Sequence, residues 1–456
     1  MLDATIAAIA TPLGEGGLAV IRLSGANAFA IADKCFLPVG KSSLKPSVAP
    51  THTIQFGKIT RDGATIDEVL LAVLRAPRTF TREDTVEISC HGGLLPAKLV
   101  LDALLASGAR QAEPGEFTKR AFLNGRIDLA QAEAVADLIH SRTELALTAA
   151  NEQLAGKLSH RINQLRDDLM LTLAHVEAHL DFPDEDILPD TKEKLLQRLE
   201  NGIAFMDELL RTANEGQILR RGIRAAIVGR PNAGKSSLLN QLLGRDRAIV
   251  SHLPGTTRDT IEETANIRGI PVVFIDTAGL RGSHDEIERE GIRRSLESLT
   301  RSEFILHVLD ASEPLTTADE KYFAEFAGKK RIIVRNKTDL AVKMFLPENL
   351  LSPTVAVCCV SGQGIELLKD TIKSLVWAGE IKAEMLQVAI NSRHQDALNR
   401  ARSATRQAGD ALRSDLTLEL VALDLRIAAN AVGEVVGKTT TEDLLDSIFS
   451  TFCIGK

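Results

Sequence analysis

One glycine-rich stretch has the residue types and spacing of a phosphate-binding loop. Residues 229–236 read Gly-Arg-Pro-Asn-Ala-Gly-Lys-Ser, the P-loop pattern G-x-x-x-x-G-K-S. Backbone N–H groups of such a turn can point at phosphate oxygens, Lys235 adds a full positive charge, and Ser236 can hold Mg²⁺. The apolar run 223–228 and the leucine-rich segment 237–243 predict the strand and the helix that such a loop requires.

Two further motifs and a threonine pair favour guanine as the base. The segment 276–279 reads Asp-Thr-Ala-Gly after an apolar run, which would place a carboxylate near Mg²⁺ and a glycine N–H near the γ-phosphate. The segment 336–339 reads Asn-Lys-Thr-Asp, and the Asp339 carboxylate can accept hydrogen bonds from guanine N1–H and N2–H, whereas adenine has an unprotonated N1. Thr256 and Thr257 lie between the motifs, where a switch threonine would complete the Mg²⁺ coordination. The predicted GTP-binding residues are Asn232, Ala233, Gly234, Lys235, Ser236, Ser237, Thr256, Thr257, Asp276, Thr277, Ala278, Gly279, Asn336, Lys337 and Asp339.

Composition narrows the class of protein further. The 456 residues are 44% hydrophobic, which suits about three folded domains. The formal net charge of −7 gives no global attraction to nucleic acid, so an RNA contact would need a local basic surface. The five cysteines include no C-x-x-C pair, which argues against a disulfide framework or a zinc site. The first basic residue is Arg22 and no apolar run reaches the length of a membrane span, so we expect a cytoplasmic protein with no membrane partner.

The elements that must position these motifs divide the chain into four predicted segments, giving a multidomain α/β fold. Residues 1–118 mix short β-rich runs with a helical stretch, as in an α+β domain. Residues 119–216 and 381–456 have helical periodicity, and each must bury an apolar stripe. Residues 217–380 alternate apolar strands with helices, as in a doubly wound, mostly parallel sheet. The sequence therefore predicts a discontinuous all-α domain interrupted by an inserted P-loop GTPase domain.

Three further local patterns predict structure, and for the last two a functional interpretation is also possible. Leucines at steps of three and four predict one long amphipathic helix over 154–180. The acidic, proline-flanked run 181–189 favours a solvated loop over a metal site. Gly14, Gly16 and Gly17 favour a turn before a strand, because Ala19 stands where a dinucleotide fingerprint needs its third glycine.

The sequence pattern alone does not identify the residue that activates water for GTP hydrolysis. Leu280 follows the Asp-Thr-Ala-Gly motif where many small GTPases carry a glutamine that orients water, and a leucine cannot do so. The domain is then either a slow binding switch or takes that group from elsewhere. The charged segment 285–290 is the nearest source of a carboxylate, although its pattern favours an exposed helix face.

Over essentially its whole length the chain resembles the MnmE (TrmE) family of tRNA-modification GTPases. Besides the GTPase motifs, the matching pieces are Thr11-Pro12 with Val20 to Gly25, Pro114 to Phe117, Arg120 to Asn124, Asp128 to Ala134, and Phe452 to Lys456.

The resemblance implies a potassium-activated GTPase whose nucleotide domains pair across their faces in a homodimer. The K⁺ ion would supply charge where an arginine finger acts in other GTPases. The resemblance adds Ser251 to the predicted GTP-binding residues. It also makes Glu288 the catalytic residue that positions water, whereas the pattern of residues 285–290 favours an exposed helix face. The implied metal ligands are Asn232, Ser251, Leu253 and Thr256 for K⁺, and Ser236 and Thr257 for Mg²⁺.

The resemblance also implies folate chemistry. Arg22, Glu87, Arg126 and Lys456 would bind a 5-formyl- or methylene-tetrahydrofolate, since these charges suit the pterin and the anionic glutamate tail. A one-carbon unit would go to C5 of the wobble uridine of certain tRNAs as an aminomethyl or carboxymethylaminomethyl group. FAD would lie on the partner protein MnmG (GidA) in a heterotetramer, because this chain has no dinucleotide fingerprint.

Cys453 has three interpretations. The terminal Cys-Ile-Gly-Lys has the length of a prenylation box, but Gly455 and Lys456 do not suit its last two positions. A buried structural thiol is the second interpretation. The resemblance suggests the third, a residue needed for the modification.

Two departures from the family pattern bear on the site. Residues 358–360 read Cys-Cys-Val where such GTPases often have Ser-Ala-Lys against the guanine edge, so we expect modest guanine affinity with selectivity retained through Asp339. Ser251 stands where threonine is common and keeps the hydroxyl.

The competing functions are a ribosome-assembly or translation GTPase that binds RNA without modifying it, and a stand-alone folate aminomethyltransferase.

Overall fold

The structure is a computed structural model, and it divides into two compact units. It describes residues 4–41, 43–181, 192–244, 262–275, 301–347, 350–377, 389–414 and 417–455. The first unit comprises Met1–Ala136, Ser159–Lys192 and Gln407–Lys456, and the second comprises Asp137–Leu158 and Glu193–Arg406. The four segments predicted from sequence have boundaries at 118, 216 and 380, and these stay predictions.

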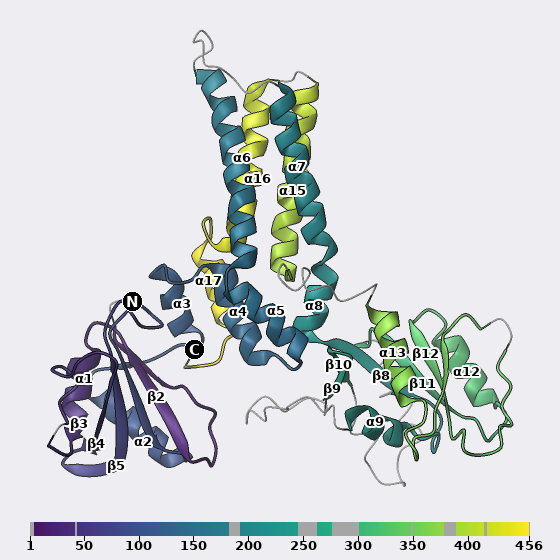
Figure 1. The fold of residues 1–456 in the computed structure, drawn as a ribbon, viewed down its shortest axis with the longest axis horizontal. Coiled ribbons are helices and arrows are strands. Elements are labelled where there is room, and N and C mark those ends of the chain that lie inside the picture. The colour runs from purple at the N-terminus through teal and green to yellow at the C-terminus, as the bar shows by residue number, and fades with distance from the viewer. Residues whose placement is uncertain are drawn as a thin grey trace. The chain divides into compact units, whose positions relative to one another are not determined.

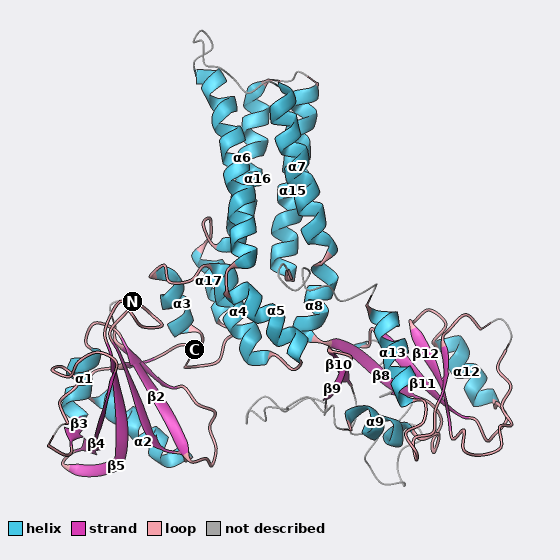
Figure 2. Ribbon diagram, in the orientation of Figure 1, coloured by secondary structure: helices cyan, strands magenta, loops and turns pink. Residues whose placement is uncertain are grey.

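A mixed sheet with helices on one face forms the amino-terminal part of the first unit (Figure 2). The strand order is β3-β4-β5-β6-β2-β1-β7, antiparallel throughout except for the parallel pair β1 and β7. Helices α1 (Ala28–Cys35) and α2 (Leu94–Ala106) share one apolar core with the sheet. The predicted α+β domain is therefore confirmed. The strands are β1 (Ile6–Ile9), β2 (Leu18–Ser24), β3 (Phe36–Pro38), β4 (Thr53–Arg61), β5 (Ala64–Leu74), β6 (Thr85–His91) and β7 (Arg110–Gln111).

Helices complete the first unit. In Figure 1, α6 (Lys157–Asp181) and α16 (Leu418–Val436) run side by side, and Arg426 on α16 pairs with Glu177 on α6 at 2.7 Å. The prediction of one helix over 154–180 is wrong at its start, because α5 ends at Leu154 and Gly156 adopts φ +85° before α6 begins. The remaining helices are α3 (Glu116–Leu123), α4 (Leu129–His140), which crosses the unit boundary, and α17 (Glu442–Phe449). The acidic run 181–189 lies outside the described residues beyond Asp181.

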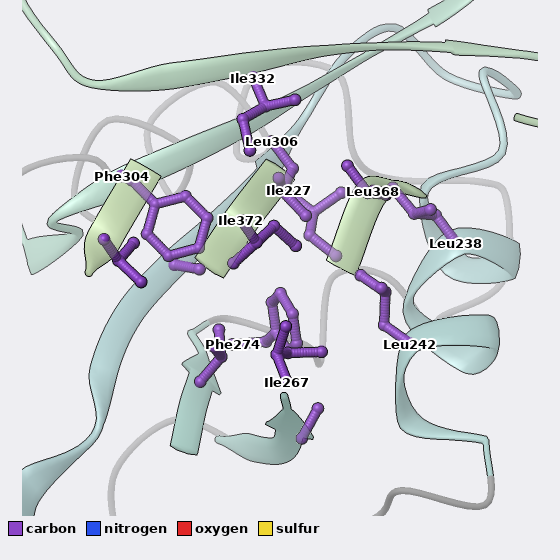
Figure 3. Close-up of a cluster of buried hydrophobic side chains, with 14 of the residues drawn as sticks. Ile227, Leu238, Leu242, Ile267, Phe274, Phe304, Leu306, Ile332, Leu368 and Ile372 are labelled. Atoms are coloured by element: carbon purple, nitrogen blue, oxygen red, sulfur yellow. The ribbon is translucent and has the colours of Figure 1, made fainter. Parts of the chain in front are cut away.

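The second unit contains a mostly parallel sheet in the order β13-β12-β11-β8-β10-β9, with only β9 and β10 antiparallel. Alternate strand residues face opposite sides: Leu306 joins the core beneath α9 (Lys235–Leu243) and α13 (Ile365–Val376), whereas Ile305 joins a cluster with Phe326 beyond α12 (Thr317–Glu325). Figure 3 shows the first of these cores. Because both faces are covered, the predicted doubly wound sheet is confirmed. The strands are β8 (Ile223–Val228), β9 (Glu263–Ile267), β10 (Ile270–Phe274), β11 (Phe304–Asp310), β12 (Arg331–Asn336) and β13 (Thr354–Ala356).

Four more helices belong wholly or mainly to the second unit: α5 (Glu144–Leu154), α7 (Lys192–Arg211), α8 (Ala213–Arg221) and α15 (Ser392–Arg413). Arg402 on α15 pairs with Asp207 on α7 at 2.6 Å, which holds these two long helices together. Among the helices that the structure describes, none has a stretch both long and apolar enough to cross a membrane.

Candidate nucleotide-binding site

The glycine-rich loop leaves the carboxyl end of β8, a buried strand between β11 and β10. Its two patterned glycines occupy positions that exclude a side chain. Gly229 has φ +147°, and a Cβ there would lie 2.2 Å from the Val308 carbonyl oxygen. Gly234 has φ +96°, and a Cβ there would lie 2.0 Å from Asn336 Nδ2. The loop therefore packs closely against the ends of two neighbouring strands because both positions are glycine.

Lys235 is the first residue of α9 and folds back over the loop. Its Nζ donates to the carbonyl oxygens of Gly229 and Arg230, each at 2.8 Å. Burial lowers the pKa of Lys235. Ser236 and Ser237 follow it in the first turn of the helix, and Asn232 has a left-handed backbone with φ +62°.

Asn336, the last residue of β12, joins the glycine-rich loop to the loop after β13. Its side chain is 2% exposed. Its Nδ2 donates to the Ala233 carbonyl oxygen at 2.9 Å, and its Oδ1 accepts from the Cys359 N–H at 3.2 Å. One amide therefore fixes the phosphate loop and residues 358–360 relative to each other.

Lys337 and Asp339, which belong to the same motif as Asn336, each contact a side chain outside the motif. Lys337 has φ +64°, and its Nζ lies 2.6 Å from Asp310 Oδ2. Burial acts to raise the pKa of Asp310, but hydrogen bonds from Lys337 and Ser312 together hold it below its usual value. Asp339 is exposed, and its Oδ1 accepts a hydrogen bond from the Cys358 thiol at 3.3 Å.

Sequence reasoning missed Asp310, the carboxylate partner of Lys337. The signal was present, because a polar residue directly follows the apolar run of β11 and therefore lies at the same sheet edge as the glycine-rich loop. Arg230 was also missed: its guanidinium pairs with Glu313 at 3.0 Å and with Asp319 at 3.1 Å.

Part of the predicted site lies outside the described residues. This holds for Ser251, Leu253, Thr256, Thr257, Asp276, Thr277, Ala278, Gly279, Leu280 and Glu288. Of the implied metal ligands, the structure thus describes Asn232 and Ser236.

The first unit brings together three of the four residues assigned to folate, and the fourth, Lys456, lies outside the described residues. Arg22 and Glu87 are directly opposite each other on β2 and β6, with Arg22 Nε 2.8 Å from Glu87 Oε1. The Phe80 ring contacts both cations, at 5.9 Å from Arg22 and 4.9 Å from Arg126.

Arg126 also lines an open hollow of about 530 Å³ with other cationic side chains, Arg78 and Arg82 among them. Burial and the neighbouring charge of Arg82 lower the pKa of Arg126. Because guanidinium groups gathered in this way repel each other, the hollow favours an anionic ligand.

Cys453 lies in the carboxy-terminal segment of the first unit and is half-buried. Its carbonyl oxygen accepts from the Gly115 N–H at 3.4 Å. Gly455 follows with φ +96°, and a Cβ there would lie 2.5 Å from the Ile9 carbonyl oxygen. The segment therefore packs against the end of β1. The role of the Cys453 thiol stays a prediction.

A glycine-rich loop after β8, bonded through Asn336 to the Asn-Lys-Thr-Asp loop in a mostly parallel sheet, places the protein in the class of P-loop GTPases. Two family models match, "GTP-binding protein TrmE N-terminus" over residues 5–126 and "MnmE helical domain" over residues 129–453. The chain is 47% identical over 459 residues to the tRNA modification GTPase MnmE of Geobacillus kaustophilus, covering 99% of each chain. It is 46% identical over 460 residues to that of Chloroflexus aurantiacus, covering 100% of each. The chain belongs to the tRNA modification GTPase MnmE family, as its motifs predicted.

Among solved structures, the G domain of the T. maritima FeoB iron transporter is 27% identical to this chain, with a TM-score of 0.26. The match covers 34% of this chain and 98% of that domain.

Proposed function

We propose that this protein hydrolyses GTP and that hydrolysis gates a folate-dependent modification at C5 of the wobble uridine of certain tRNAs. The observation that carries the proposal is the Asn336 side chain, which hydrogen-bonds both the phosphate loop and the loop beside Asp339. Asp339, which would bind the base, and Lys235, which would bind the phosphates, are thereby held at a fixed distance from each other. The names of the relatives state both the GTPase activity and tRNA modification for those proteins.

The described residues fit a nucleotide–Mg²⁺ complex. Lys235 Nζ, already placed over the loop by two carbonyl oxygens, exchanges these neutral acceptors for anionic phosphate oxygens. The Ser236 hydroxyl, one residue further along α9, would hold Mg²⁺ together with Thr257. The metal supplies positive charge that neutralises the phosphates. Asp339 accepts the N1–H and N2–H of guanine.

The remaining groups of the hydrolysis step come from the resemblance. Asn232 has the exposed, left-handed backbone of a loop apex, which suits an oxygen ligand for K⁺. Ser251, Leu253 and Thr256 would complete that site. Bound K⁺ supplies charge near the transferred phosphoryl group. Leu280 has no polar atom with which to orient water, and the resemblance assigns that role to Glu288.

The first unit binds the folate in this proposal. Arg22 and Glu87 form a fixed ion pair that can hydrogen-bond a pterin, and Arg126, stacked on Phe80, takes an anionic carboxylate. Lys456 completes the set. The folate is a 5-formyl- or methylene-tetrahydrofolate, and the partner MnmG contributes FAD in a heterotetramer built on a homodimer of this chain.

Mass spectrometry of tRNA nucleosides from cells with and without this chain tests the proposal. We expect deletion to remove the C5-modified wobble uridine, and the intact gene to restore it. Glu288→Ala should fail to restore it although the protein accumulates, because binding persists without hydrolysis. A parallel Arg126→Ala variant tests the folate site. Unchanged nucleosides after deletion would refute the modification and favour an RNA-binding GTPase.

A further inference from the structure

Arg120 lies in the segment 120–124, which matches the family pattern but belongs to neither the nucleotide site nor the set of folate residues. It is part of α3, and its side chain is 1% exposed. Because a guanidinium stays charged, its burial requires anionic partners. Nη1 lies 3.1 Å from Glu83 Oε1 and Nη2 lies 2.9 Å from Glu116 Oε1, while Nη2 also donates to the Ala4 carbonyl oxygen at 2.8 Å. Arg120 therefore connects α3 to two segments that are distant in the sequence.

One of these segments is the loop between β5 and β6, residues 75–84. Ser24 on β2 donates to Glu83 Oε2 at 2.7 Å, so the carboxylate that binds the buried guanidinium also binds the sheet. Asn124 Nδ2, directly after α3, donates to the Thr81 carbonyl oxygen at 2.6 Å. The β5–β6 loop is thereby fixed to both α3 and β2, and the buried ion pair is the charged contact among these bonds.

The same loop carries Phe80, whose ring contacts two residues assigned to folate. The ring centroid lies 5.9 Å from the Arg22 guanidinium and 4.9 Å from that of Arg126. Arg22 has two further contacts, the Phe117 ring at 5.6 Å and the ion pair with Glu87. A displaced β5–β6 loop would therefore release Arg126 from Phe80, whereas Arg22 would keep its other partners.

We propose that Arg120 is a positioning residue for folate binding. Its ion pair with Glu83 fixes the β5–β6 loop, so that Phe80 holds the Arg126 guanidinium where it meets the anionic carboxylate of the ligand. Arg120 is buried and acts through the loop. The inference rests on the proposed function, since it takes Arg126 as a folate-binding residue.

Isothermal titration calorimetry of the full-length protein with 5-formyltetrahydrofolate tests the assignment. For Arg120→Lys we expect folate affinity to fall about 10-fold, the scale of one partly desolvated cation–π contact. The lysine keeps the charge, but it lacks the two arms with which arginine binds Glu83 and Glu116 together. Ser24→Ala leaves the buried ion pair in place and removes one hydrogen bond to Glu83, so it should lower folate affinity about 3-fold. GTP hydrolysis should stay at the wild-type rate in both variants.

A stability control separates positioning from a general loss of folding. Val100 on α2 is 0% exposed and shares an apolar core with Ile21, whereas the side chain of the next residue of β2, Arg22, lies on the other face of the sheet. Val100→Ala should therefore lower the Tm of the protein, because it leaves a cavity in that core, and keep wild-type folate affinity.

A double-mutant cycle tests whether Arg120 acts through the ring. Phe80→Leu alone should weaken folate binding. In that background Arg120→Lys should have no further effect on folate affinity, because the ring that the loop positions is gone.

Three results would overturn the inference in a protein that binds 5-formyltetrahydrofolate. They are wild-type folate affinity in both Arg120→Lys and Ser24→Ala, a loss in the Phe80→Leu background equal to that in the wild type, or a similar loss in Val100→Ala. A wild-type protein that binds no folate would refute the folate part of the proposed function as well as this inference.

Discussion

His307 should make the nucleotide-binding sheet sensitive to acid. It lies on β11, is 0% exposed, and contacts the rings of Tyr322, Phe323 and Phe326. Within the described part of the chain, neither of its ring nitrogens has a hydrogen-bond partner. Burial, assisted by the charge of Arg331 and opposed by Asp319, lowers the pKa of His307 from 6.5 to about 4.

The sign of the effect follows from proton binding. Between pH 6.5 and about 4 the unfolded state holds a proton on this imidazole and the folded state does not. The free energy of unfolding therefore rises with pH over this window: the contribution is fully present above pH 6.5 and is lost as the pH falls toward 4. A pKa lowered from 6.5 to about 4, at about 1.4 kcal/mol per pH unit, makes the loss on the order of 3 kcal/mol.

His307→Leu removes both the titration and the unpaired ring nitrogens. We expect it to raise the free energy of unfolding at pH 7.5 by about 1–3 kcal/mol, the cost of an unsatisfied buried polar group. We also expect it to flatten the pH dependence below 6.5. His307→Gln removes the titration but keeps a polar group, so it should flatten the same slope without stabilising the fold.

Trp377 provides the assay. It is the only tryptophan of the sequence, is 3% exposed, and belongs to the same apolar core as Leu306 and Val308. Urea unfolding of the full chain, followed by its fluorescence from pH 7.5 to 4.5, reports on this sheet. His160→Gln, at an exposed position on α6, is the control and should keep the wild-type slope. An unchanged slope in both His307 variants would refute the reasoning.

Two further predictions concern the nucleotide site. GTP hydrolysis by the intact protein should be faster in KCl than in equimolar NaCl, and Asn232→Ala should remove the difference; equal rates for the wild type in both salts would contradict the potassium site. Asn336→Ala breaks the bonds to Ala233 and Cys359 together, so we expect GDP affinity to fall at least 10-fold, roughly the 1.5–3 kcal/mol of two hydrogen bonds; an affinity like that of the wild type would show that another contact fixes the two loops.

Helices, strands and turns were predicted best from the sequence where a single local pattern determines them. The apolar run 223–228 coincides with β8, and Gly14 and Gly17 lie at bends directly before β2, in agreement with the predicted turn before a strand. The helix over 154–180 was predicted too long because leucine spacing continues across the break. Gly156 was the available signal, since a left-handed residue ends a helix regardless of the apolar period around it.

The site was less predictable because its bonds join distant residues. The motif named Asn336 as a GTP-binding residue but did not predict its bond to Ala233, which connects residues 103 positions apart. The Cys358 contact with Asp339 and the pairing of Lys337 with Asp310 likewise depend on which strands are neighbours. Strand order is set by the packing of both sheet faces, which no local pattern encodes.

The pairing of cations around the loop determines where nucleotide binding can gain free energy. Lys337 and Arg230 already have carboxylate partners, so a phosphate would offer them a similar acceptor at the cost of breaking an ion pair. Among the residues that the structure describes, Lys235 has only neutral carbonyl acceptors, and burial disfavours its charge, so an anionic oxygen stabilises it most. Phosphate binding should therefore depend chiefly on Lys235 and base selection on Asp339. Since Asn336 fixes the distance between their loops, its loss should weaken the contribution of both.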